Sequence, residues 1–79
     1  MGAKAFILIE TVRGRSMEVD SALKHLGGVR SANPVTPPYD IIVVAEGETL
    51  SEIESMVNLR IQSIAGVTRT VTCPTIAPS

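Results

Sequence analysis

Side chains able to bind a small polar ligand are concentrated in the segment Thr36–Asp40, whose sequence is TPPYD. Asp40 supplies a carboxylate, which accepts hydrogen bonds from charged donors. Tyr39, the only tyrosine, joins an apolar ring to a hydroxyl that needs a polar partner. Thr36 adds a second hydroxyl. The alternative roles are structural: Asp40 caps its own turn, Tyr39 packs between subunits, and Thr36 is an ordinary threonine at the end of a strand.

A second set of hydroxyls is spaced by two residues, at Thr68, Thr70 and Thr72. In a strand this spacing places the three side chains on one face. Together with Arg69 of another subunit they could bind a carboxylate. The alternative is a half-solvated edge strand, where threonine is favoured without any ligand. Because Arg69 points away from the threonines of its own chain, we expect no joint role within one copy.

The other reactive residue types are isolated and predict neither catalysis nor metal binding. His25 lies near the expected end of a helix, where the helix dipole favours a cation. Cys73 has no histidine or basic neighbour in sequence to activate its thiol, so we expect a small, half-buried residue. One histidine and one cysteine do not make a zinc site. We therefore expect no enzyme activity, no metal and no cofactor.

Length and charge exclude several classes of protein. The 79 residues suffice for one domain, and a domain this small usually needs disulfides, metal or oligomerisation for stability. A single cysteine excludes a disulfide within the chain, which leaves self-association. A net charge of −1 and 3% aromatic residues provide neither a basic stripe nor a stacking platform for nucleic acid. The short apolar runs match neither a membrane helix nor a signal peptide, so we expect a cytoplasmic protein.

Hydrophobic patterning predicts two helices between four strands. The strands are expected over 5–12, 29–36, 40–46 and 67–73, where β-branched and apolar residues dominate. The first helix starts with Ser16 as its N-cap and ends at Gly27-Gly28. The second starts at a capping box formed by Thr49 and Glu52 and ends at Gly66. The expected buried faces comprise Val19, Ala22, Leu23 and Leu26 in the first helix, and Leu50, Ile53, Val57, Ile61 and Ile64 in the second.

The order β-α-β-β-α-β is typical of the ferredoxin-like α+β fold. Right-handed crossovers place both helices on one face of a four-stranded antiparallel sheet. Pro34 and Pro74 favour edge positions for the second and fourth strands, because proline cannot donate to the ladder. We expect the domain to span 5–74, after a lead of residues 1–4 and before a loose tail of residues 75–79, without a helix-turn-helix domain.

The sheet has an apolar second face, which two helices on the first face cannot cover. In the first strand Phe6 and Leu8 point one way and their neighbours the other, and the third strand alternates in the same manner. Both faces of both central strands are apolar, which marks an interaction surface. We expect sheet-to-sheet dimerisation through Phe6, Leu8, Ile41 and Val43. The alternatives are a misassigned strand or a tail that covers the sheet.

Two segments carry a resemblance to a known family. VTPPYDIIVV and RIQSIAGVTRTVT resemble the ligand-binding domain of the Lrp/AsnC transcription regulators, also called the regulation-of-amino-acid-metabolism domain. The likeness covers residues 5–73 and is most specific over 36–40 and 66–72. It implies dimers of the dimeric α+β barrel type, rings of such dimers (often four, an octamer), and an amino-acid effector held where dimers meet.

The resemblance also implies the residues of the effector site, which are Thr36, Pro38, Tyr39, Asp40, Thr70 and Thr72. The sequence departs from the family at Pro37, where the family usually has glycine in a Thr-Gly-x-Tyr-Asp-like turn. Glycine permits a positive φ and a close approach of the backbone to a ligand. Proline forbids that φ and removes an N–H donor.

The resemblance thus implies a regulatory module that binds an amino acid and changes its assembly state or joins full-length Lrp/AsnC regulators. The first alternative is a purely structural oligomerisation module without a ligand. The second is a small enzyme of the dimeric α+β barrel type. Such enzymes line a cleft with histidine, arginine and aromatic residues, which are scarce here.

Overall fold

The computed structural model describes residues 2–76 and has the predicted order of elements. The strands are β1 (Ala3–Thr11), β2 (Val29–Pro34), β3 (Ile41–Gly47) and β4 (Val67–Pro74). The helices are α1 (Ser16–Leu23) and α2 (Leu50–Met56), and α2 continues into a π-helical turn, η1 (Val57–Ile61). The second strand was predicted to extend to residue 36, but β2 ends at Pro34. None of the helices within residues 2–76 is long and apolar enough to cross a bilayer.

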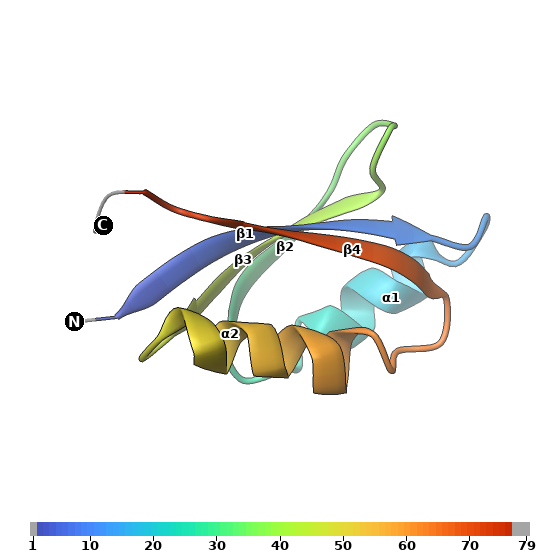
Figure 1. The fold of residues 1–79 in the computed structure, drawn as a ribbon. Coiled ribbons are helices and arrows are strands. Elements are labelled where there is room, and N and C mark those ends of the chain that lie inside the picture. The colour runs from blue at the N-terminus through green and yellow to red at the C-terminus, as the bar shows by residue number, and fades with distance from the viewer. Residues whose placement is uncertain (1, 77–79) are drawn as a thin grey trace.

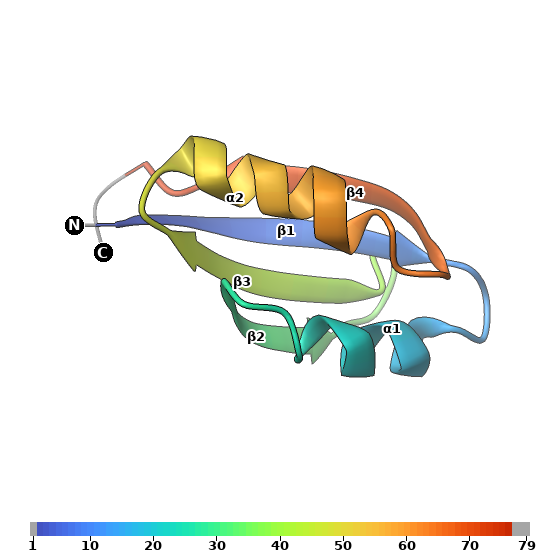
Figure 2. The same cartoon turned by 90° about the horizontal axis from the view of Figure 1, so that it is seen from below.

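The four strands form one antiparallel sheet in the order β2-β3-β1-β4, which confirms that the second and fourth strands are its edges. Both helices lie on the same face of the sheet (Figure 1). Seen from the helical side, α2 runs over β1 beside β4, and α1 lies beside β2 (Figure 2). The predicted ferredoxin-like arrangement is therefore correct.

Local signals explain most helix boundaries. The Thr49 hydroxyl accepts a hydrogen bond from the Glu52 N–H at 3.1 Å, and the Glu52 carboxylate accepts one from the Glu48 N–H at 3.0 Å. The capping box therefore forms, except that the Glu52 carboxylate bonds to the N–H of Glu48 and not to that of the N-cap residue Thr49. The prediction for Ser16 was wrong. Ser16 is the first helical residue, and the N-cap is Arg15, whose side chain makes no capping bond.

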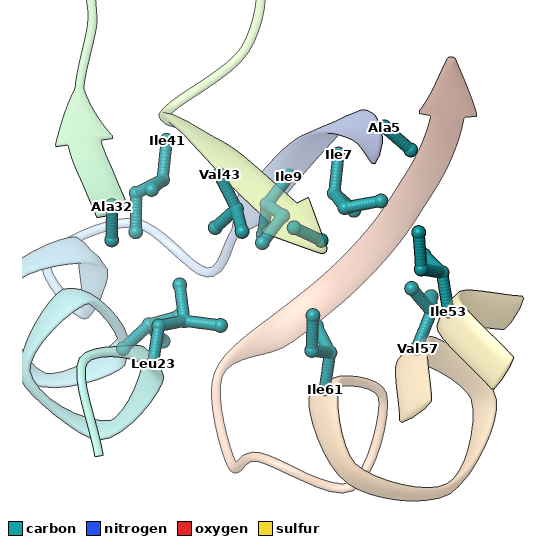
Figure 3. Packing of buried hydrophobic residues seen from close by; sticks show 12 residues of the cluster. Ala5, Ile7, Ile9, Leu23, Ala32, Ile41, Val43, Ile53, Val57 and Ile61 are labelled. Carbon is teal, nitrogen blue, oxygen red and sulfur yellow. The ribbon is translucent and has the colours of Figure 1, made fainter. Parts of the chain in front are cut away.

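The hydrophobic core lies between the helices and one face of the sheet (Figure 3). Val19 and Leu23 of α1 are buried, as are Ile53, Val57 and Ile61 along α2 and η1. These side chains meet alternate residues of the two central strands, which are Ala5, Ile7 and Ile9 of β1 and Ile41, Val43 and Ala45 of β3. Of the predicted helix faces, these five helix residues are buried and Leu26 and Ile64 pack against them, whereas Ala22 and Leu50 are half-buried and outside the core.

The sheet extends past the predicted domain of residues 5–74 at both ends, because β1 begins at Ala3 and Thr75 is bonded to β1. Thr75 donates from both its N–H and its hydroxyl to the Lys4 carbonyl, at 3.0 and 3.1 Å, so this residue continues the pairing of β4 with β1. Residues 77–79 lie outside the described part of the chain.

Candidate functional site

The turn between β2 and β3 projects from the sheet on the side opposite the helices (Figure 1). It contains Thr36 and Pro38, which are exposed, and Tyr39 and Asp40, which are half-buried. Its end is attached to the sheet, because the Asp40 N–H donates to the Ile9 carbonyl and the Asp40 carbonyl accepts from the Val35 N–H, both at 2.9 Å. The turn therefore presents polar groups from a fixed base.

The Asp40 carboxylate has a structural partner. Its Oδ2 accepts a hydrogen bond from the Thr11 N–H at 2.8 Å, just past Ile9 and Ile41, the last residues that β1 and β3 pair. This contact satisfies a backbone donor beyond the end of the β1–β3 ladder. Asp40 thus anchors the end of β1 instead of capping its own turn, and its second oxygen remains available to a ligand.

Replacing Asp40 by alanine is expected to lower the free energy of unfolding by about 1.5 to 3 kcal/mol, because the Thr11 N–H loses a charged acceptor. Asp40→Asn retains an acceptor oxygen and is expected to cost about 1 kcal/mol or less. Urea denaturation of the two variants measures the difference. Equal stability of Asp40→Ala and the unaltered chain would contradict a stabilising role for this bond.

The predicted threonines of β4 divide into two kinds. Thr70 and Thr72 pair with Ile9 and Ile7, whose side chains are buried beneath the helices, so these two hydroxyls face the helical side. Thr68 lies where the register shifts, and its hydroxyl donates to the Glu10 carbonyl at 3.1 Å. The Thr68 hydroxyl therefore has a structural role, which matches the alternative to ligand binding.

Thr70 and Thr72 line a polar groove between β4 and the second helix. The groove has a volume of about 240 Å³ and is also lined by Glu54, Asn58 and Gln62, with Val57 at its base. The Gln62 side-chain amide donates to the Thr70 hydroxyl at 3.0 Å. Glu54, Asn58 and Gln62 were not predicted as site residues. The signal that could have found them is their four-residue spacing, which places side chains along one flank of a helix.

A single copy does not bring the predicted effector residues together. Asp40 and Thr70 flank the same residue of β1, Ile9, from opposite sides, so their backbones are about 9 to 10 Å apart, or two strand spacings. Their segments also face in opposite directions, since the turn projects away from the helices (Figure 1). Groups from both sets can contact one small ligand only if a second copy contributes.

The open face of the sheet is apolar at its centre, but its residues differ from those predicted. Ile41 and Val43 were expected on this face with Phe6 and Leu8, and this was wrong. Both are fully buried against the helices, because β1 and β3 pair Ile9 with Ile41 and Ile7 with Val43. The side chains that share the open face with Phe6 and Leu8 are those of their partners, Val44 and Ile42.

Two residues of β4 extend this surface. Val71 pairs with Leu8 and Cys73 with Phe6, so both belong to the open face. Cys73 is exposed, which corrects the expectation of a half-buried thiol. We call Phe6, Leu8, Ile42, Val44, Val71 and Cys73 the open-face cluster. An ion pair between Arg69 and Glu10, at 3.7 Å, lies at its border and confirms that Arg69 points away from Thr70.

A larger groove, of about 400 Å³, lies on the helical side and contains none of the predicted site residues. Gly27 and Gly28 line it together with the apolar side chains of Ile53, Met56 and Leu59, and Glu46, Glu52, Ser55 and Arg60 complete the lining. Its surface is mostly apolar, so it is a weaker candidate for a polar ligand than the groove beside β4.

Comparison with known proteins assigns the chain to one family of ligand-binding domains. The family model of the Lrp/AsnC ligand binding domain matches residues 4–77, so the chain belongs to this family. Members are regulatory proteins, which agrees with a binding function. No curated protein sequence gives a significant match.

Solved structures of similar proteins include short chains of similar length. TTHA0845 from Thermus thermophilus is 28% identical with a TM-score of 0.90, covering 98% of this chain and 96% of that one. The hypothetical protein PHS023 from Pyrococcus horikoshii is 31% identical with a TM-score of 0.86, covering 99% and 93%. The transcriptional regulator NMB0573 from Neisseria meningitidis, in a complex with L-Met, is 17% identical with a TM-score of 0.84, covering 95% and 50%.

Proposed function

We propose that this chain is an effector-binding module that holds a free amino acid between copies of itself and couples binding to assembly. The observation that carries the proposal is the separation of its two polar segments. The turn with Tyr39 and Asp40 and the strand with Thr70 and Thr72 face opposite sides of one copy. A site that uses both needs two copies.

The chemistry of the two segments suits an amino acid. Asp40 offers a carboxylate oxygen beyond the one that Thr11 occupies, and it can accept from an ammonium group. The hydroxyls of Thr70 and Thr72 can donate to a carboxylate. The methionine bound to NMB0573, a protein of the same fold, supports the class of ligand.

Assembly supplies the coupling. The open-face cluster gives each copy an apolar surface that associates with a second copy, and further contacts between dimers build a ring. A ligand that binds only where copies meet stabilises the assembled state by mass action. In the cell the same contacts would join the chain to full-length Lrp/AsnC regulators and so alter their assembly on DNA.

Addition of the cognate amino acid is expected to change the mass of the particle, as measured by light scattering, and to raise its melting temperature. Calorimetry with the common amino acids, one at a time, identifies the ligand. Tyr39→Phe, which removes the hydroxyl and keeps the ring, tests whether the turn takes part. Intact assemblies that bind none of the amino acids would contradict the proposal.

That contradicting outcome defines a second candidate function, a structural oligomerisation module without a ligand. The observation that favours it is the pair Pro37-Pro38 in the turn, since neither residue has a backbone N–H to offer a ligand. Pro37→Gly separates the two candidates. A variant that gains amino-acid binding absent from the unaltered chain would show that the proline had removed it.

A further inference from the structure

The polar groove beside β4 has a regular lining. One side consists of Glu54 from α2, Asn58 from η1 and Gln62, the residue that caps η1, and the other side consists of Thr70 and Thr72 from the edge strand. The volume of about 240 Å³ lies below the range of about 300 to 1,000 Å³ typical of pockets for drug-sized ligands. The groove therefore fits one side chain better than a whole cofactor.

The π-helical turn η1 keeps the three helix residues in line. An α-helix rotates by about 100° per residue, so two steps of four residues displace a side chain by about 80° around the axis. A π-helical turn contains more residues than an α-helical turn, so each residue rotates the chain by a smaller angle and the displacement is reduced. Its i→i+5 bond runs from the Gln62 N–H to the Val57 carbonyl at 2.9 Å. Gln62 is thus directed to β4, where its amide reaches Thr70.

The groove is rich in acceptors and has one charged group, the carboxylate of Glu54. The ion pairs within residues 2–76 are formed by other carboxylates. The neighbouring cations Arg60 and Arg69 line other grooves. Gln62 donates one N–H to Thr70, so its carbonyl oxygen and its second N–H remain for a ligand, and the oxygen can accept from a cation.

We propose that this groove receives the side chain of the bound amino acid and selects one that ends in a cation, an ammonium or a guanidinium. Glu54 provides the opposite charge, and the amide oxygens of Asn58 and Gln62 accept the remaining N–H donors, which leaves the hydroxyls of Thr70 and Thr72 to donate to the effector's carboxylate. A second copy that covers the groove removes water from this pair and strengthens it. This inference rests on the proposed function, because it names the class of effector for the same site.

Calorimetry with lysine, ornithine and arginine against norleucine, methionine and glutamate tests the selection. We expect the basic amino acids to bind and norleucine, which has the apolar chain without the charge, to bind more weakly by about 10-fold or more. Glu54→Gln is expected to weaken the basic ligands by about 10-fold to 100-fold and to leave norleucine unchanged. Glu48→Gln, which removes an equal charge from the turn before α2, is the matched control and should change neither.

Two different failures can be distinguished. Binding of neutral or acidic amino acids with affinities that Glu54→Gln does not change would overturn the inference and leave the proposed function intact. Absence of binding by every amino acid would overturn both. Glu54 is exposed on the helix surface, so circular dichroism should show the variant to be folded.

Discussion

Replacing Val43 by lysine is expected to unfold the chain, whereas the same replacement at Val44 leaves it folded. Val43 is completely buried between β3 and the helices, and its side chain contacts the apolar core. An unpaired charge at such a site costs more than about 4 kcal/mol. A domain of 79 residues has a total stability of about 4 to 12 kcal/mol. The cost of burying the lysine therefore removes most or all of the free energy of unfolding.

Circular dichroism and urea denaturation of the two variants measure this contrast. Val44 is only half-buried and lies on the open face, where a lysine can extend its ammonium into water. The pair is a matched control, since the residues are adjacent and the substitution is identical. A folded Val43→Lys variant with near-normal stability would show that Val43 does not face the core.

The fold could be predicted because strong local signals agreed with one topology. Gly28 and Gly66 end the two helical segments at φ values of 92° and 102°, which glycine adopts without strain. Thr49 caps the second helix, and the prolines of β2 and β4 lie at the sheet edges. Each signal needs only a few neighbouring residues, which is why the sequence alone predicts it.

The faces of β3 could not be predicted by the same reasoning. Apolar residues occupy every position from Ile41 to Ala45, so the sequence has no apolar–polar alternation to show which side chains of β3 face the core. No short turn joins β1 to β3, because α1 and β2 lie between them in the sequence, so turn geometry does not fix their register either. A usable signal was the charge of Glu46, which shares a face with Ile42 and Val44 and pairs with Lys4 across the strands.

The candidate site was predicted in part, for a related reason. The turn 36–40 and the threonines of β4 were recognised from residue type and resemblance, because each is a local pattern. The four-residue spacing of Glu54, Asn58 and Gln62 can be read from the sequence, but that these residues face the edge strand is seen only in the structure. Their alignment depends on the π-helical turn, which the helical period of the sequence does not predict.

Replacing Leu8 by lysine is expected to separate the copies without unfolding them. Leu8 lies at the centre of the open-face cluster, between Ile42 on one neighbouring strand and Val71 on the other. A stable interface covers about 800 Å² per partner, about a sixth of the 5031 Å² that one copy exposes. An unpaired lysine buried there costs about 3 kcal/mol or more, so the dissociation constant should rise more than about 100-fold.

Light scattering over a range of concentrations measures the loss of assembly, and Cys73 provides an independent readout. Its thiol is exposed in one copy and lies on the open face opposite Phe6, so association should protect it from alkylation. Leu8→Lys should restore the rate of alkylation, and Leu59→Lys, at a leucine that is 74% exposed on the second helix, should change neither mass nor rate. If the unaltered chain is a monomer with a freely reactive Cys73, the open face does not drive assembly, and the effector site loses its second copy.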